Sequence, residues 1–436
     1  MKVDGAQVVV VGMARSGIAA VELLIKHGAR VCAADQNPAP VTLCGQHFPV
    51  EPQSEAVFGK ADLVILSPGV PANLPIIEQV RRRGIQIVGD LELASWYLKG
   101  KIIGITGSNG KTTTTALTGH IMKSAGIAAQ VGGNIGLAPA SMVDTSRDGQ
   151  WNVLELSSFQ LETTDTFHPH VAAVLNVTPD HLDRHGTMER YAAAKGRIFV
   201  NQTPRDFAVL NADDTACTVF AHQLRARTHW FSGTKRCDAG AFLADGSIVL
   251  NGEVLMKGGE VPLRGLHNLE NTMAAAVMAQ LAGATHEQIR AAVTSFPGVE
   301  HRLEFVRDLN GVAWYNDSKA TNVDATLKAI AAFPGGLWVI LGGKDKDSDY
   351  SMLAAPLKSK CSGVFLIGAA ADKIAAQLNS AAPLIHAKTL DNAVARAAAA
   401  SKPGDTVLLA PACASFDQFE NFEHRGREFK RLVREL

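Results

Sequence analysis

Short runs of apolar residues alternate along the chain with longer stretches in which apolar residues recur every three or four positions. The first run, residues 8–11, contains only valine, as expected of a strand buried on both faces of a sheet. It passes through a glycine turn into a helical pattern, and a second run, 30–35, ends in an acid. Strand, turn, helix and strand in this order are typical of a βαβ unit.

The same alternation continues to the C-terminus. Further buried strands are predicted at 62–67, 85–88, 101–105, 153–155, 171–175, 207–210, 312–315, 337–341, 364–367 and 406–410. Between about 228 and 263, short alternating runs separated by Asn-Gly and Gly-Gly suit β-hairpins, and residues 267–281 follow a helical pattern.

This pattern predicts an α/β protein of three domains in series, each with a mostly parallel sheet. We expect an N-terminal Rossmann-like domain over 1–93 and a C-terminal Rossmann-like domain over 299–436. Between them, 94–298 would form a P-loop ATPase-type α/β domain with a small β region.

Composition limits the class of protein further. The chain has 436 residues, of which 47% are hydrophobic and 19% charged, and 42 basic residues balance 42 acidic ones. No global field would hold it on nucleic acid or an anionic membrane. The six cysteines are scattered, which suits a reducing compartment; they are Cys32, Cys44, Cys217, Cys237, Cys361 and Cys413. With no cationic leader and no long apolar run, we expect a cytoplasmic protein.

The turn after the predicted strand 101–105 has the composition of a phosphate-binding loop. It reads Gly-Ser-Asn-Gly-Lys-Thr over residues 107–112 and opens a helical pattern. The common loop, G-x-x-x-x-G-K-[ST], would place a glycine where this chain has Ile105, so the loop is one residue shorter. Backbone N–H groups at a helix start bind phosphate oxygens, and Lys111 adds positive charge. We therefore interpret this turn as a phosphate site and not as a turn required only for packing.

The glycine turn at residues 12–17 is a weaker signal. Its middle position is Ala14, whose methyl group would crowd the pyrophosphate of a dinucleotide. A turn needed only for packing explains the sequence equally well. Asp35, at the end of the next strand, could accept hydrogen bonds from a ribose or a uracil, which favours a nucleotide-type ligand over a dinucleotide.

Several side chains near the predicted phosphate loop could hold metal ions. The Thr112 hydroxyl can reach a magnesium ion, and Glu155 ends a strand, where one carboxylate suffices for this metal. His181 and His185, four residues apart behind another apolar strand, could instead hold zinc. The remaining zinc ligands are not evident, so His181 as a ligand of a second metal ion is the preferred hypothesis. On spacing alone, Lys195 has only the properties of a solvated helix lysine.

Three polar turns follow predicted strands of the C-terminal domain. Asp317 and Lys319 follow one strand, the loop 342–346 follows another, and 411–416 follows a third. Ligands of α/β sheets bind at the carboxyl ends of the strands. We therefore expect a ligand edge in this domain.

Taken together, these motifs resemble the Mur ligases of peptidoglycan synthesis, and among them the D-glutamate-adding branch, over essentially the whole chain. The segments that carry the resemblance are TGSNGKTT, GGNIG, LELSSFQLE, NVTPDHLDRH, YAAAKGRI, HNLEN, HRLE, NDSKATN and PACASFDQFENFEHRG. The ATP motifs are shared with folylpolyglutamate synthases, whereas GGNIG, ELSSFQLE and ACASFDQF are specific to the glutamate-adding branch. The short phosphate loop is this family's own form.

The resemblance implies an enzyme that uses ATP and two magnesium ions in cell-wall biogenesis, and with it in cell shape and division. We expect it to be a monomer whose partners are UDP-N-acetylmuramoyl-L-alanine and D-glutamate, with no nucleic acid or membrane. The implied ATP-binding residues are Gly107, Ser108, Asn109, Gly110, Lys111, Thr112, Thr113, Asn268, Asn271, Arg302 and Asp317. The implied metal ligands are Thr112, Glu155, His181 and a carbamylated Lys195.

The family pattern also assigns the two other substrates. Residues near the UDP substrate would be Arg15, Ser16, Asp35, Gln36, Ser67, Gly69 and Asn134. Those that receive D-glutamate would be Lys319, Thr321, Lys346, Ser415, Phe416 and Phe422. Catalysis would fall to Lys111, His181, Lys195 and Lys319.

Three departures from the family pattern affect these assignments. Ala14 and Arg15 alter the N-terminal loop, and Gln36 replaces a small hydroxyl residue beside Asp35. Asp347 stands where glycine is usual, and an added acid there calls for a compensating cation such as Lys344.

Three rival functions remain at this stage. They are a folylpolyglutamate synthase, a binding protein that hydrolyses ATP without ligation, and a dehydrogenase. The third has least support, because Ala14 spoils the dinucleotide fingerprint.

Overall fold

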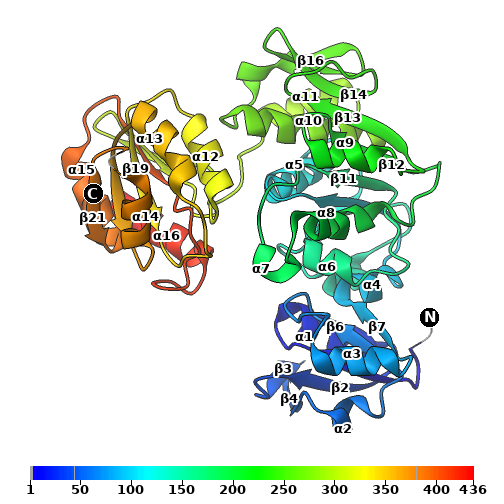
Figure 1. Ribbon diagram of the computed structural model, residues 1–436. Coiled ribbons are helices and arrows are strands. Elements are labelled where there is room, and N and C mark those ends of the chain that lie inside the picture. The colour runs from blue at the N-terminus through cyan, green and yellow to red at the C-terminus, as the bar shows by residue number, and fades with distance from the viewer. Residues whose placement is uncertain (1–2, 44, 380) are drawn as a thin grey trace. The chain divides into compact units, whose positions relative to one another are not determined.

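The computed structural model describes residues 3–43, 45–379 and 381–436 (Figure 1). Cys44 lies outside the described residues. Three main β-sheets, each flanked by helices, follow one another along the chain, which confirms the predicted α/β fold class. None of the described helices combines the length and the apolar character that a membrane crossing requires.

The N-terminal sheet has five parallel strands in the order β5-β2-β1-β6-β7. Its strands are β1 (Gln7–Val11), β2 (Arg30–Asp35), β5 (Val50–Pro52), β6 (Leu63–Leu66) and β7 (Gln86–Gly89), with a separate hairpin of β3 (Val41–Leu43) and β4 (Gln46–Phe48). Its helices are α1 (Arg15–Lys26), α2 (Glu55–Phe58), α3 (Pro75–Arg82) and α4 (Asp90–Ser95).

The valines of β1 are required on both faces of this sheet. Val8 and Val10 pack in one core cluster with residues of α1, whereas Val9 and Val11 pack in another with residues of α3. Alternate side chains of a strand point to opposite faces, so a run of four valines fills both layers.

The central sheet has nine strands in the order β16-β15-β14-β13-β12-β11-β8-β10-β9. The strands are β8 (Lys101–Thr106), β9 (Ala129–Gly133), β10 (Trp151–Glu155), β11 (Val171–Val174), β12 (Phe207–Asn211), β13 (Arg227–Ser232), β14 (Gly240–Ala244), β15 (Ser247–Leu250) and β16 (Glu253–Lys257). The helices are α5 (Lys111–Ser124), α6 (Ser158–Glu162), α7 (Leu182–His185), α8 (Met188–Gly196), α9 (Thr215–Ala221), α10 (Leu266–Leu281) and α11 (His286–Thr294), with short 3₁₀ turns η1 (Pro139–Thr145), η2 (Arg197–Phe199) and η3 (Gly258–Glu260).

The predicted hairpin region is shorter than expected. β13 pairs in parallel with both of its neighbours, and only β14, β15 and β16 form antiparallel pairs. Alternating side chains mark β13 as a half-buried strand, and this pattern alone does not distinguish the two pairing directions.

The C-terminal sheet has six strands in the order β17-β18-β22-β19-β20-β21, and β17 pairs with β18 in antiparallel fashion. The strands are β17 (Glu304–Leu309), β18 (Val312–Asn316), β19 (Leu337–Gly342), β20 (Cys361–Ile367), β21 (Leu384–Lys388) and β22 (Thr406–Leu409). The helices are α12 (Val323–Ala331), α13 (Ala354–Lys360), α14 (Ala371–Leu378), α15 (Leu390–Ala400) and α16 (Phe422–Glu435), with the 3₁₀ turn η4 (Ser351–Leu353).

By its internal contacts the chain divides into two compact units. One comprises Met1–Glu260 with Glu270–Ser295, and the other comprises Val261–Leu269 with Phe296–Leu436. The first unit thus contains both the N-terminal and the central sheet. The boundaries near residues 93 and 298 stay a prediction.

Candidate active site

The predicted phosphate loop connects β8 to α5 at the carboxyl edge of the central sheet. Gly110 has a φ of 84°, and a Cβ there would lie 2.3 Å from Asn271 Oδ1. A glycine is therefore required on both conformational and steric grounds. Thr112 and Thr113 are buried in the first turn of α5.

Side chains from the neighbouring strand loop hold this turn in shape. Asn176 Oδ1 accepts a hydrogen bond from Asn109 N at 2.9 Å, and Asn176 Nδ2 donates to Asn109 O at 3.1 Å. The Ser108 hydroxyl donates to Thr178 O at 2.9 Å and lies 3.1 Å from the Tyr191 hydroxyl. Neither Asn176 nor Tyr191 was predicted to have a role, although each is the first residue of a quoted motif.

Two lysines converge on one carbonyl of the loop. Lys111 Nζ donates to Gly107 O and Ser108 O, each at 2.8 Å, and Lys195 Nζ also donates to Gly107 O at 2.8 Å. Lys195 is only 1% exposed, so it is not the solvated helix lysine that spacing alone suggested. Burial, and secondly the Lys111 charge, hold the pKa of Lys195 well below its usual value.

Glu155 lies at the same edge of the sheet. It is the last residue of β10 and pairs with Ile105 of β8 on one side and Gly133 of β9 on the other. Its Oε1 accepts a hydrogen bond from Asn134 Nδ2 at 3.0 Å. Its Oε2 is buried without a hydrogen-bond partner. A buried, unsatisfied carboxylate oxygen beside a phosphate loop is what a hard cation such as Mg²⁺ requires.

The two histidines of the 178–185 segment are not arranged as a zinc pair. His181 caps α7 with a φ of 54°, and the ring of Phe159 packs against the imidazoles of both His181 and His185. Both nitrogens of His185 already have partners, Ser158 and Glu162. The zinc alternative therefore has no support here.

All seven residues predicted to lie near the UDP substrate line one cavity of about 680 Å³. They are Arg15, Ser16, Asp35, Gln36, Ser67, Gly69 and Asn134. Asp35 Oδ2 accepts a hydrogen bond from Met13 N at 2.8 Å and thereby fixes the first glycine turn. Gln160 of α6 also lines the cavity and had no role in the sequence analysis.

A buried acid lies beside this cavity. Asp90, the first residue of α4, is 1% exposed, and neither carboxylate oxygen has a hydrogen bond of good geometry, although Ser16 and Gln160 are close. Burial raises the pKa of Asp90 to about 6. Asp90 was not predicted as a site residue, because an acid that follows a strand is also typical of the first turn of a helix.

In the second compact unit, Arg302 and Asp317, both predicted to bind ATP, lie close enough for their charges to interact. This carboxylate is buried, and its burial raises the pKa of Asp317 to about 6, against the opposing effect of Arg302. Asp317 Oδ1 accepts a hydrogen bond from Leu303 N at 3.3 Å. Asn268 Nδ2 donates to Arg264 O at 2.7 Å.

The residues predicted for D-glutamate come from three loops of the same sheet. Lys319 Nζ lies 5.1 Å from the centre of the Phe422 ring. Ser415 is buried, whereas Phe416 is exposed, and Lys346 and Thr321 lie on the loops after β19 and β18.

One buried arginine joins the loops that carry these residues; it lies in the quoted segment PACASFDQFENFEHRG but was given no role from the sequence. Arg425 donates to Ser318 O at 2.8 Å and to Cys413 O at 3.2 Å. Because its guanidinium is fully buried, it fixes the loop before Lys319 and the loop before Ser415 in one arrangement.

One expectation about this region was wrong. The cation beside Asp347 is Lys373, whose Nζ lies 3.4 Å from Asp347 Oδ1 and 2.6 Å from Asp345 Oδ2, and not Lys344. Lys373 comes from α14, so its proximity depends on the fold and not on sequence spacing. Asp347 has a φ of 59°, a conformation that explains why glycine suits this position.

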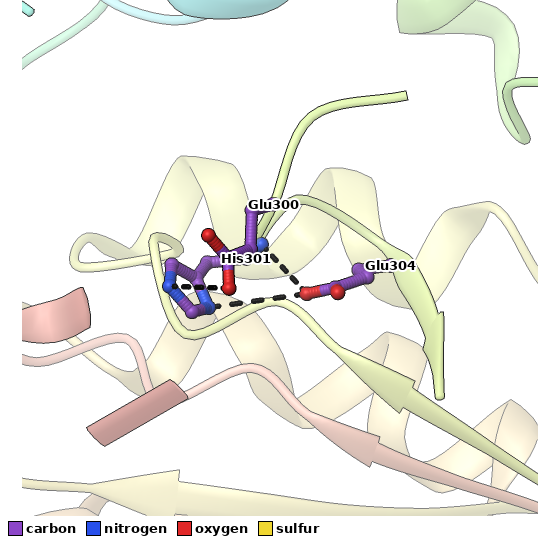
Figure 2. A group of neighbouring side chains, drawn as sticks. All are labelled: Glu300, His301 and Glu304. Carbon is purple, nitrogen blue, oxygen red and sulfur yellow. Dashed lines mark hydrogen bonds and ion pairs between the residues drawn. The ribbon is translucent and has the colours of Figure 1, made fainter. Parts of the chain in front are cut away.

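Glu300, His301 and Glu304 form a compact cluster at the start of the C-terminal domain (Figure 2). Such a set could hold a metal ion, but Lys430 Nζ already contacts both Glu300 Oε1 and Glu304 Oε1. The ammonium group supplies the positive charge. We interpret this cluster as an ion-pair network that anchors α16.

Comparisons with known proteins agree with this architecture. The family model for the MurD-like N-terminal domain matches residues 6–89, that for the Mur ligase middle domain matches 105–279, and that for the glutamate ligase domain matches 301–413. The chain belongs to the Mur ligase family, and the predicted three-domain fold is confirmed.

Relatives of known name place the chain within that family. It is 58% identical to a UDP-N-acetylmuramoylalanine--D-glutamate ligase of Solibacter usitatus, over 100% of this chain and 99% of the relative. It is 51% identical to the protein of the same name from Acidobacterium capsulatum, over 99% and 97%. The resemblance to the D-glutamate-adding branch is therefore confirmed.

Solved structures share the fold at low sequence identity. A UDP-N-acetylmuramate-alanine ligase from Thermotoga maritima superposes with a TM-score of 0.62 at 20% identity, covering 99% of each chain. A pseudomurein peptide ligase type C from Methanothermus fervidus gives 0.64 at 16% identity, over 99% of this chain and 100% of that one.

Proposed function

We propose that this chain is an ATP-dependent ligase that joins D-glutamate to UDP-N-acetylmuramoyl-L-alanine, in the synthesis of peptidoglycan precursors. The terminal carboxylate of the nucleotide sugar attacks the γ-phosphate of ATP, which gives an acyl phosphate and ADP. The amine of D-glutamate then displaces phosphate through a tetrahedral intermediate. Within the family assignment, the observation that carries this proposal is the unsatisfied Glu155 oxygen at the edge that also bears the phosphate loop.

The first step brings two anions together, and this chain has residues to offset their repulsion. Lys111 and the backbone N–H groups at the start of α5 would bind the ATP phosphates. Lys111 Nζ is held in place by two loop carbonyls, so little reorganisation would accompany nucleotide binding.

Glu155 and Thr112 fit a magnesium ion, since one offers a buried, unpaired carboxylate oxygen and the other a hydroxyl at the helix start. When bound, magnesium neutralises charge that develops on the phosphate oxygens. His181, with Lys195 as a carbamate, would serve a second ion.

The geometry supports a carbamate at Lys195. Two ammonium groups share the Gly107 carbonyl in a buried site, and like charges repel at this separation. Loss of one proton gives the free amine, and addition of CO₂ to this amine with loss of a second proton would replace one of these positive charges with a negative one. Carbon-13 NMR after incubation with ¹³C-bicarbonate should show a carbamate signal that is missing in Lys195→Arg.

The other two substrates would bind at separate places. The cavity that contains Asp35 and Asn134 would take the nucleotide sugar. The loops of Lys319, Lys346 and Ser415 would take D-glutamate, with Lys319 neutralising charge as the acyl phosphate reacts. Arg302 and Asp317 would contact ATP from the C-terminal domain.

The decisive experiment is phosphate release by the purified protein with Mg-ATP and UDP-N-acetylmuramoyl-L-alanine. D-glutamate, L-glutamate, meso-diaminopimelate or no amine would be added in parallel. Turnover with D-glutamate alone, with a product heavier by one glutamyl unit, is expected. Release that is indifferent to the amine would contradict ligation, and turnover with a folate acceptor would indicate a folylpolyglutamate synthase.

Action in the cytoplasm as a monomer also belongs to this proposal. Light scattering during size-exclusion chromatography should give the mass of one chain, 46.2 kDa.

A further inference from the structure

A chain of polar contacts centred on Glu162 crosses from the central domain to the N-terminal domain. Arg184 Nη2 donates to Glu162 Oε2 at 3.0 Å and to Val70 O, in the N-terminal domain, at 3.3 Å. On the other side, His185 Nδ1 lies 3.1 Å from Glu162 Oε1, and His185 Nε2 lies 3.0 Å from Ser158 Oγ. We call Ser158, Glu162, Arg184 and His185 the Glu162 bridge.

The Glu162 bridge is sheltered from solvent. The Arg184 side chain is 15% exposed, that of Glu162 22% and that of His185 3%. A second ion pair, Lys26 with Asp144, joins the same two domains but is 58% and 61% exposed. Solvent-exposed ion pairs contribute little to stability or geometry. A sheltered ion pair in which each carboxylate oxygen has a hydrogen-bond partner holds the joined groups in place.

Ring contacts extend the Glu162 bridge to His181. The guanidinium of Arg184 lies 4.8 Å from the centre of the Phe159 ring, which also packs against His185 at 5.5 Å and against His181 at 5.0 Å. His181 itself has a φ of 54°. A non-glycine residue keeps such a conformation only where its surroundings hold it, and Phe159 with α7 provides those surroundings.

The Glu162 bridge lies beside the cavity of the first compact unit, through its contact with Val70 and through the helix α6 that it shares with Gln160. Val70, which accepts from Arg184, lines it together with Gly69 on the loop after β6. Gln160, two residues before Glu162 on α6, lines it from the central domain. A shift of Arg184 would therefore move one wall of the cavity relative to the other.

We propose that the Glu162 bridge is a set of positioning residues for the ligation. It holds the Val70 loop in register with α6 and His181, so that binding of the uridine diphosphate portion aligns the distant acceptor carboxylate with the phosphate loop. This inference rests on the proposed function. It assigns the role of positioning to four side chains that would not themselves touch reacting atoms.

Single and double substitutions test whether these side chains act as one device. Glu162→Gln and Arg184→Gln should each raise the KM for the nucleotide sugar about tenfold, because a charge-assisted hydrogen bond contributes on this order. The KM values for ATP and D-glutamate should be unchanged. The KM for the nucleotide sugar should rise no further in the double variant than in either single variant. The first substitution already breaks the contact between the two side chains, so the second has no further effect.

The exposed ion pair supplies a matched control. Asp144→Asn breaks the other link between the same two domains and should leave all three KM values within twofold. An equal rise in the three KM values for Glu162→Gln, or an effect of Asp144→Asn as large as that of Glu162→Gln, would mean that the Glu162 bridge only stabilises the fold.

A truncated acceptor distinguishes positioning from general damage. N-acetylmuramoyl-L-alanine 1-phosphate lacks the uridylyl group, so it cannot use binding energy from that part of the substrate. Glu162→Gln and the wild type should therefore have the same kcat/KM for the truncated acceptor. An equal fractional loss on both acceptors would refute the proposal.

The Glu162 bridge can be tested apart from the ligase assignment. If the wild type shows no D-glutamate-dependent turnover, the proposed function fails. Calorimetric titration with UDP-N-acetylmuramoyl-L-alanine still tests the Glu162 bridge, because it measures the Kd of this compound directly. We expect the Kd to be about tenfold higher for Arg184→Gln and unchanged for Asp144→Asn. Equal affinity of Arg184→Gln and the wild type would overturn it.

Discussion

The two glycine turns of the first compact unit have the same local architecture but different charged groups hydrogen-bonded to the backbone around them. Each follows a parallel strand and opens a helix, α1 in one case and α5 in the other. Two acids lie at the first turn, where Asp35 accepts from Met13 N and Asp90 lies buried beside Ser16, although Arg15 of the turn lines the same cavity. Two lysines lie at the second turn, where Lys111 and Lys195 share the Gly107 carbonyl, with Glu155 at the same sheet edge.

This difference indicates which ligand each turn suits. Two converging ammonium groups favour a polyanion, whereas carboxylates favour neutral hydrogen-bond donors such as a base or a sugar hydroxyl. The glycines alone do not reveal this. Gly17 is needed because a Cβ there would lie 1.8 Å from Gly12 O, and this is a packing requirement that any tight βα turn imposes.

The largest expected effect comes from removing the charge at the second turn. Lys111→Ala should lower kcat/KM for ATP by about 10³-fold, because a fixed cation at the transferring phosphate is among the largest contributions to catalysis. ADP formation should fall in parallel. The control is Lys123→Ala, which changes an exposed lysine in the last turn of the same helix and should match the wild type. A fall in kcat/KM of less than tenfold for Lys111→Ala would contradict the proposed difference between the two turns.

The buried acid near the first turn should destabilise the protein at neutral pH. The pKa of Asp90 is raised to about 6 from an ordinary value of 3.8. The folded state therefore binds its proton more tightly than the unfolded state, and stability is lost as pH rises from about 4 to about 6. Asp90→Asn removes this cost, so its unfolding free energy should exceed that of the wild type by up to about 3 kcal/mol above pH 7 and by little at pH 4.

Glu92, on the same helix, gives a control of opposite sign. Its carboxylate accepts from the backbone N–H groups of Asp165, Thr166 and Phe167, and its pKa is lowered. Such a group stabilises the fold above its ordinary pKa, and this stabilisation is lost as pH falls. Glu92→Gln should therefore destabilise at pH 7. Thermal unfolding between pH 4 and 8 measures both variants, and a pH-independent difference for Asp90→Asn would contradict its assignment.

A residue of the second compact unit tests whether the comparison concerns nucleotides alone. Ser415→Ala should raise the KM for D-glutamate by 10- to 100-fold, on the order of a lost hydrogen bond to a charged group. ATP binding should be unchanged, because the proposed ATP phosphate site lies at the second turn. Steady-state kinetics with each substrate varied in turn gives the comparison. If Ser415→Ala and Lys111→Ala impair the same substrate, the separation of sites is wrong.

The sequence predicted those parts of the fold and site that depend on local pattern. Fully buried strands such as β1 and β8 have continuous apolar runs, and the phosphate loop has its glycines and lysine in a fixed order. The edge strands β5, β9, β17 and β21 were missed, because a strand with one solvated side has few apolar residues to reveal it.

Features that depend on distant contacts could not be found in this way. Lys373 reaches Asp347 from another helix, and Arg425 joins loops about 10 and 100 residues away in the chain. Asp90 is exceptional only because the fold buries it without a hydrogen bond of good geometry. Spacing conveys periodicity, but burial and pairing between remote segments are properties of the tertiary structure.

The smallest expected effect concerns the acid that shapes the first turn. Asp35 accepts two backbone hydrogen bonds, from Met13 N at 2.8 Å through Oδ2 and from Asn37 N at 3.0 Å through Oδ1. Asp35→Asn keeps one acceptor and turns an amide group toward the other N–H, so one bond is lost at a cost of about 1 kcal/mol. The KM for the nucleotide sugar should rise about fivefold, and the KM for ATP should stay constant.

Asp62→Asn is the matched control for this change. Asp62 also accepts from a backbone N–H of the N-terminal sheet, Gln7 N at 2.8 Å, but it does not line the cavity. Its substitution should therefore leave the nucleotide-sugar KM unchanged. If both variants raise that KM equally, Asp35 contributes only to the stability of the domain. The charged groups around the two glycine turns would then differ without determining which ligand each turn binds.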